Sequence, residues 1–154
     1  MNETVILLVE DNEDDVILTL RAFEKAKLAN RIVVARDGVE ALDILHGDGS
    51  SELGEAFPQL VLLDLQLPRL DGIQVLRRIR ETERTADLPV VILTSSDEER
   101  DRAQGYRLKA NSYIRKPVDF DQFLEAVSQV GFYWLVLNRG PPAPGGAWDP
   151  GGEG

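Results

Sequence analysis

Short apolar runs alternate along the chain with longer amphipathic segments, and this alternation limits the folds open to the chain. The first run, Thr4 to Val9, is apolar almost throughout, as in a strand that is buried on both faces of a sheet. Four further runs are expected to form strands, at residues 31–35, 60–63, 88–93 and 112–114. Because helical segments separate these runs, we expect parallel strands with helices on both faces. The sequence therefore predicts an α/β fold with a doubly wound, five-stranded parallel sheet.

The segments between the strands have the spacing of amphipathic helices. The side chains of Asn12 to Asp15 can cap a first helix, in which apolar residues then recur at steps of three and four. Four further helices are expected, one ending near residue 47, one around residues 73–80, one over 98–107 and one from 119 to about 137. Residues 47–57 are rich in Gly, Ser and acidic residues, which predicts a loop insertion.

The length of 154 residues predicts one domain, which we assign to residues 1–138. Residues 139–154 are rich in Pro and Gly and are expected to form a disordered tail. The net charge of −10 disfavours nucleic-acid binding, and no apolar run approaches the roughly 20 residues of a membrane span. The chain has no cysteine and no signal peptide pattern, which fits a reducing compartment. We therefore expect a cytoplasmic protein that binds neither nucleic acid nor membrane.

Polar and charged residues stand where the predicted strands end. Glu10 and Asp11 follow the first strand, Asp64 follows the third, Thr94 the fourth and Lys116 the fifth. In parallel sheets these ends meet at one edge, where ligands bind. Clustered carboxylates need a cation to stay ionised together, and an all-oxygen donor set favours Mg²⁺ or Mn²⁺. A carboxylate can attack phosphorus, while a metal, a lysine and a hydroxyl stabilise the phosphoryl oxygens.

Each of these residues taken alone would more often be a helix cap or a loop residue. Because they occur together at the ends of four strands, we favour a phosphoryl-transfer site over a set of unrelated caps and loop residues. The motifs resemble those of receiver domains of two-component response regulators. The matching segments are Val9–Asn12, Leu62–Pro68, Asp71–Gly72, Thr94–Ser96 and Lys116–Pro117. The resemblance covers about residues 4–137 and implies the flavodoxin-like (βα)5 receiver fold.

The resemblance also implies how the site binds metal and phosphate. Asp64 would be the phosphoacceptor, and a sensor histidine kinase would be the phosphodonor in a two-component phosphorelay. Asp11, Asp64 and the backbone carbonyl of Gln66 would bind Mg²⁺ directly, and Glu10 would act through water. Such a protein catalyses only its own phosphorylation and autodephosphorylation, so we do not expect an enzyme that acts on an external substrate.

Further roles follow from the same resemblance. Lys116 would pair with the phosphate, and its peptide bond to Pro117 would be cis. Thr94 would bind the phosphoryl group and move on activation, and Tyr113 would be the aromatic residue that rotates with it. The resemblance thus implies that signalling depends on a phosphorylation-dependent conformational switch.

Two features resemble the small stand-alone regulators that partner bacterial and cyanobacterial phytochromes. One is the insertion at residues 47–57 and the other is the aromatic segment at residues 132–135. They suggest a bacteriophytochrome as the kinase. The apolar residues 132–137 also suggest a homodimer, because a large exposed apolar patch often marks an interface. The alternative is that Phe132 and Trp134 complete the core of a monomer.

Several other functions compete with this interpretation. A haloacid-dehalogenase-type hydrolase would need a second Asp two residues after Asp64, where this chain has Gln66. A receiver that no longer undergoes phosphorylation would lack an acid or the lysine, and a transcription factor would need a DNA-binding module. His46 is expected on the surface of the second helix, which argues against a phosphotransfer histidine. A phosphate sink or intermediate relay receiver is the alternative to an output-bearing regulator.

Overall fold

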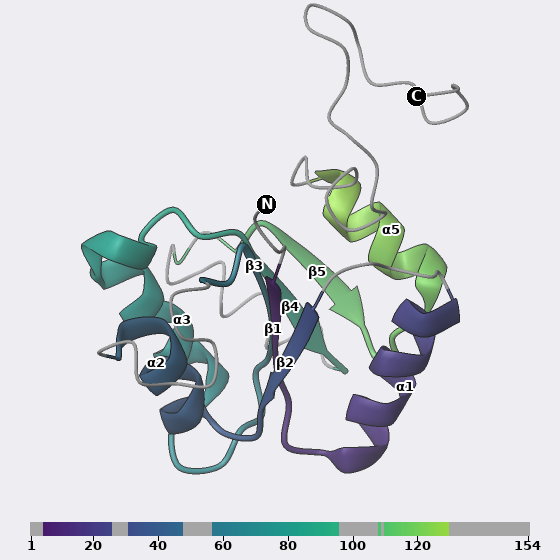
Figure 1. Cartoon of the computed structure of the whole chain (residues 1–154), viewed down its shortest axis with the longest axis horizontal. Coiled ribbons are helices and arrows are strands. Elements are labelled where there is room, and N and C mark those ends of the chain that lie inside the picture. Colours follow the sequence, from purple (N-terminus) through teal and green to yellow (C-terminus); the bar gives the residue numbers. More distant parts are fainter. Residues whose placement is uncertain (1–4, 26–30, 48–56, 96–107, 109, 130–154) are drawn as a thin grey trace, which may run out of the picture.

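The computed structural model describes residues 5–25, 31–47, 57–95, 108 and 110–129, which form a sheet between two layers of helices (Figure 1). The strands are β1 (Val5–Val9), β2 (Arg31–Ala35), β3 (Leu60–Asp64), β4 (Val90–Thr94) and β5 (Ser112–Arg115). The helices are α1 (Glu13–Lys25), α2 (Gly38–His46), α3 (Gly72–Glu81), the 3₁₀ helix η1 (Glu83–Thr85) and α5 (Phe120–Gln129). None of these described helices combines the length and the apolar character needed to cross a bilayer.

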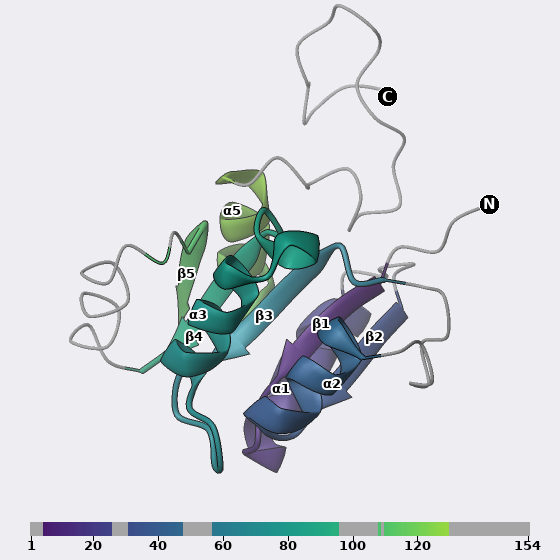
Figure 2. The same ribbon diagram turned by 90° about the vertical axis from the view of Figure 1, so that its left-hand side faces the viewer.

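The five strands form one parallel sheet with the order β2-β1-β3-β4-β5. After β1 the chain moves outward to β2 and then returns across β1 to β3, so the strand order reverses between β1 and β3. Figure 2 shows the strands running side by side. Ligands of doubly wound sheets bind at the carboxyl ends of the strands that flank such a reversal. The predicted fold is confirmed, and its topology places the candidate site at the ends of β1 and β3.

Helices cover both faces of the sheet, with α1 and α5 on one face and α2 and α3 on the other (Figures 1 and 2). Successive residues of β1 are buried on alternate faces, as the period of a strand requires. Ile6 and Leu8 pack on the α1 and α5 side, where the rings of Phe23 and Phe123 meet with centroids 4.5 Å apart. Leu7 belongs to the core on the α2 and α3 side. The strands are apolar throughout because helices cover both faces of the sheet.

The start of the fourth strand was predicted two residues too early. The fourth strand begins at Val90, whereas the sequence suggested Leu88. The backbone N–H of Leu88 donates to the carbonyl of Thr85, and Pro89 has no N–H to give to a ladder, so the strand starts only after the proline. The predicted helix at residues 98–107, the insertion at 48–56, the helix beyond residue 129 and the tail lie outside the described residues.

Candidate functional site

Three carboxylates meet at the carboxyl edge of the sheet. Glu10 and Asp11 directly follow β1, and Asp64 is the last residue of β3. Each of the three offers one carboxylate oxygen, and these oxygens all lie within 4.8 Å of one another. Glu10 and Asp64 are buried, while Asp11 is exposed. The predicted convergence of these acids is confirmed.

A cleft of about 450 Å³ opens at this edge of the sheet. Its walls come from the ends of β1, β3 and β4, from the start of α1 and from the segment after β5. The lining residues are Asp11, Asn12, Asp15, Asp64, Gln66, Ser95, Lys116 and Pro117. The cleft has room for a hydrated cation and a phosphoryl group beside the acids.

The ammonium group of Lys116 lies among the acids. Its Nζ atom is 2.8 Å from Glu10 Oε1, 3.1 Å from Asp64 Oδ2 and 3.1 Å from Asp15 Oδ2. Its peptide bond to Pro117 is cis, as predicted. The side chain is only 14% exposed, so water screens these contacts less than it screens surface ion pairs. The predicted proximity of the lysine to Asp64 is confirmed.

The local field alters how Glu10 and Lys116 titrate. Burial and the neighbouring Asp64 raise the pKa of Glu10 to about 8, although Lys116 acts in the opposite direction. Burial by itself lowers the pKa of Lys116, but contacts with Glu10 and Asp64 outweigh it and raise the pKa above its ordinary value. The lysine therefore stays charged among the acids.

The donor set fits a hard divalent cation. Glu10, Asp11 and Asp64 present carboxylate oxygens alone, and Mg²⁺ takes oxygen ligands. The buried Oε1 atom of Glu10 lies 2.8 Å from the ammonium of Lys116. The water ligands of a bound cation would supply further donors to the same carboxylate.

Two local turns fix the acids. On the β1 side, Glu10 Oε2 accepts from the N–H of Asn12 at 3.2 Å, and Asn12 Oδ1 caps α1 by accepting from the N–H of Asp15 at 3.0 Å. On the β3 side, Asp64 Oδ1 accepts from the N–H of Gln66 at 3.1 Å. Gln66 lines the cleft, which is where its predicted role in metal binding requires it.

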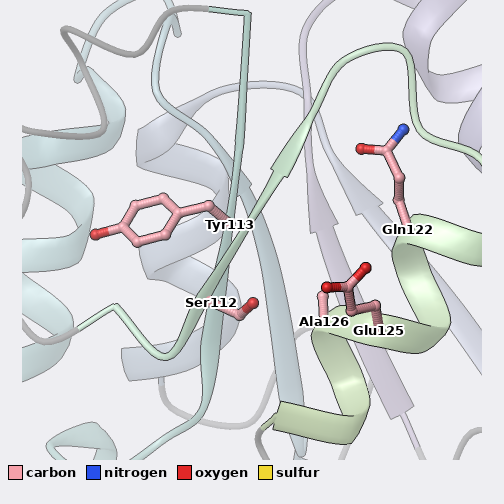
Figure 3. A pocket seen from close by; sticks show the side chains of 5 residues that line it. All are labelled: Ser112, Tyr113, Gln122, Glu125 and Ala126. Carbon is pink, nitrogen blue, oxygen red and sulfur yellow. The ribbon is translucent and has the colours of Figure 1, made fainter.

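The other predicted residues lie on β4 and β5. Thr94 ends β4 with 5% of its surface exposed, its carbonyl accepts from the N–H of Lys116 at 3.0 Å, and the next residue, Ser95, lines the cleft. Tyr113 is half-buried on β5. In Figure 3 its ring points away from Gln122 on α5, toward the opposite face of the sheet. The switch roles of Thr94 and Tyr113 stay predictions.

A second and smaller pocket of about 110 Å³ lies between β5 and α5 (Figure 3). It is lined by Ser112, Tyr113, Gln122, Glu125 and Ala126. These residues lack the acids and the lysine that gather in the larger cleft. The cleft at the strand ends is therefore the candidate functional site.

One residue of the site, Asp15, was not predicted as such, and one residue outside the site, His46, is more buried than predicted. Asp15 was interpreted only as a capping residue, yet its carboxylate contacts Lys116. Its place in the first turn of α1, four residues after Asp11, was a signal that it could face the same edge. His46 was expected on the surface but is half-buried, with Nε2 2.9 Å from the hydroxyl of Thr85. A hydroxyl partner on η1 explains this burial.

Comparison with known proteins identifies the family. Residues 6–128 match the response regulator receiver domain, and the chain belongs to that family. The probable methanogenesis regulatory protein FilR2 of Methanothrix harundinacea is 43% identical over 139 residues, which are 89% of this chain and 87% of FilR2. The response regulator Rcp1 of Synechocystis is 34% identical over 90% of this chain and 94% of Rcp1. The chain is thus a receiver domain of two-component signalling.

Solved structures give the same result. The bacteriophytochrome response regulator AtBRR is 47% identical, with a TM-score of 0.82 over 90% of this chain and 100% of AtBRR. The phosphorylated cyanobacterial phytochrome response regulator RcpA is 35% identical, with a TM-score of 0.70 over 86% and 94%. The Mn²⁺-bound form of Rcp1 is 33% identical, with a TM-score of 0.69 over 91% and 99%. The predicted likeness to phytochrome response regulators is confirmed.

Proposed function

We propose that this receiver accepts a phosphoryl group on Asp64 from a sensor histidine kinase, with Mg²⁺ as cofactor, and signals through a change of conformation. The observation that carries the proposal is the position of the Asp64 carboxylate. It lies within 4.8 Å of the two other acids, 3.1 Å from the ammonium of Lys116, and at the wall of the open cleft. A nucleophile, charge compensation and access for a phosphodonor thus occur together.

The chemistry of Asp64 follows from these neighbours. A carboxylate oxygen attacks phosphorus while the bond to the donor histidine nitrogen breaks, and the electron pair leaves with the imidazole, which takes up a proton. Asp11, Asp64 and the carbonyl of Gln66 would hold Mg²⁺, with Glu10 acting through water. When bound, the cation supplies charge neutralisation at the phosphoryl oxygens. Lys116 would bind one of those oxygens and the hydroxyl of Thr94 another, with Tyr113 following the movement of Thr94.

The residues beside Asp64 support a regulator over a hydrolase. Position 66, two residues after Asp64, carries an amide that cannot act as a general acid or base. The chain would therefore catalyse only its own phosphorylation and autodephosphorylation. The similar structures whose titles name phytochrome response regulators support a bacteriophytochrome as the kinase. No observation on the described residues favours a phosphate sink or an intermediate relay receiver.

A homodimer and a cytoplasmic location belong to the same proposal. The apolar residues 132–137 that suggested the dimer lie outside the described residues. Light scattering at micromolar concentration tests the dimer, which Trp134→Glu should dissociate. A mass of one chain that is the same in both proteins would contradict it.

Incubation with acetyl phosphate and Mg²⁺, followed by intact mass measurement and peptide mapping, tests the phosphoacceptor. We expect one added phosphoryl group, located on Asp64 and absent from Asp64→Asn. Asp14→Asn is the matched control, because Asp14 is an exposed acid of the same type on α1. Uptake by Asp64→Asn equal to that of the unaltered chain would overturn the proposal.

A further inference from the structure

The third carboxylate on Lys116 has no part in the chemistry described so far. Asp15 lies on α1, 101 residues before the lysine, and its Oδ2 atom accepts a hydrogen bond from Nζ at 3.1 Å. We propose that Asp15 is a positioning residue for Lys116, which holds the ammonium toward α1 in the unphosphorylated chain and opposes its transfer to the phosphoryl group. The inference rests on the proposed function and assigns a regulatory role to one further residue of that site.

The backbone of Asp15 is fixed, so its carboxylate has a defined place. Its N–H donates to Asn12 Oδ1 at 3.0 Å, and its carbonyl accepts from the hydroxyl of Thr19 at 2.8 Å. The Asp15 side chain is 27% exposed and the Lys116 side chain 14%. An ion pair that is shielded in this way, with one partner held by a helix cap, is more persistent than a pair of mobile surface side chains.

The geometry also makes Asp15 a competitor of the phosphoryl group. An ammonium has three N–H donors, and three carboxylate oxygens lie within 3.1 Å of Lys116 Nζ. A phosphoryl oxygen that binds the lysine must therefore displace one of them. Glu10 and Asp64 belong to the acid cluster, whereas releasing Asp15 leaves that cluster intact. Asp15 also lines the cleft, so it lies beside the space that a phosphoryl group would enter.

Removing the charge of Asp15 should therefore favour the phosphorylated state. Asp15→Asn keeps an oxygen at the same place but holds the ammonium less strongly. We expect the initial rate of phosphorylation by acetyl phosphate and the affinity for beryllofluoride, a phosphoryl mimic, to rise by about tenfold, as one nearby charge of this kind would give. Asp15→Glu keeps the charge and should restore much of the original behaviour. Asp14→Asn makes the same charge change at the next, exposed position and should alter neither quantity.

A double-mutant cycle separates an effect through the lysine from a general effect of charge. In a Lys116→Met background, Asp15→Asn should leave beryllofluoride affinity unchanged. A tenfold gain that persists without the lysine would overturn the positioning role. NMR of the lysine ¹⁵Nζ groups gives a measurement that needs no phosphorylation. The Lys116 signal should shift and its protons should exchange faster in Asp15→Asn, and an unaltered signal would also overturn the role.

The outcome for Asp15 can be separated from that for the proposed function. Asp64→Asn is assayed beside the Asp15 variants. Phosphate uptake that does not depend on Asp64 would contradict the proposed function itself. Uptake that depends on Asp64 but is equally fast in the unaltered chain and in Asp15→Asn would overturn the role of Asp15 alone.

Discussion

Gly72 lies against the backbone of Asp64, so closely that a Cβ on Gly72 would stand 2.4 Å from the Asp64 carbonyl oxygen. The same Cβ would lie 2.5 Å from the Cα of Leu65, whose carbonyl accepts from the N–H of Gly72 at 3.0 Å. These neighbours are backbone atoms and cannot turn aside as a side chain can. The first turn of α3 therefore packs directly on the backbone at the end of β3, the strand that carries Asp64.

Gly72→Ala is expected to destabilise the fold, although alanine is the better helix former. The clash with the end of β3 should outweigh the gain in helix propensity and lower the free energy of unfolding by about 1–3 kcal/mol, as overpacking does. Urea denaturation measures the change. Glu81→Ala, an exposed substitution at the other end of α3, should stay within about 0.5 kcal/mol. A Gly72→Ala protein as stable as the unaltered one would show that β3 and α3 can separate without cost.

Arg80 joins three segments near the start of β4. Its guanidinium donates to the carbonyls of Leu108 at 2.9 Å, Ala86 at 3.1 Å and Leu88 at 2.7 Å, and to Asn111 Oδ1 at 3.2 Å. Arg80→Met should remove this donor from the three carbonyls and lower the free energy of unfolding by about 2–4 kcal/mol. Arg80→Lys should recover only part of the loss, because an ammonium lacks the planar fork. Full recovery in the lysine variant, measured by urea denaturation, would mean that charge alone matters.

His46 makes the stability depend on pH in a defined direction. Burial lowers its pKa below the ordinary 6.5, and the nearby Arg84 and Arg78 lower it further. Below pH 6.5 the His46 side chain is protonated in the unfolded chain but still neutral in the folded chain, because its folded pKa is lower. The contribution of His46 to the free energy of unfolding is therefore fully present above pH 6.5. It is lost as the pH falls from 6.5 toward the lowered folded pKa.

Urea midpoints measured between about pH 8 and pH 5 test this dependence. His46→Gln can still hydrogen-bond to Thr85 but cannot titrate in this range. The unaltered chain should lose stability relative to His46→Gln as the pH falls. Curves that remain parallel over the whole range would contradict the lowered pKa.

The parts of the site that the sequence could predict are those that follow from the period and direction of the strands. Apolar runs separated by helices imply parallel strands, and parallel strands bring Glu10, Asp64 and Lys116 to one edge. The contact between Asp15 and Lys116 could not be predicted in this way. It depends on how α1 is rotated against the segment after β5, and no local pattern encodes a contact across 101 residues. An acid in the first turn of a helix is also explained by its favourable interaction with the helix dipole. The position of Asp15 therefore gave no separate indication of its contact with Lys116.

The acid cluster makes the metal requirement testable one ligand at a time. Asp11 is the exposed member of the cluster, so its removal opens no buried cavity and should leave the fold intact. Asp11→Ala should weaken Mg²⁺ binding by more than about tenfold, since even outer-shell changes cost metal sites that much. The amide signal of Gln66, whose N–H donates to Asp64 Oδ1, should shift as Mg²⁺ is added to the unaltered chain. Asp14→Ala removes an exposed acid three residues away and should leave that titration as it was. Chelation with EDTA should also stop phosphorylation by acetyl phosphate. A titration of Asp11→Ala that matches the unaltered chain would remove Asp11 from the metal site, while leaving the assignment of Asp64 to be decided by peptide mapping.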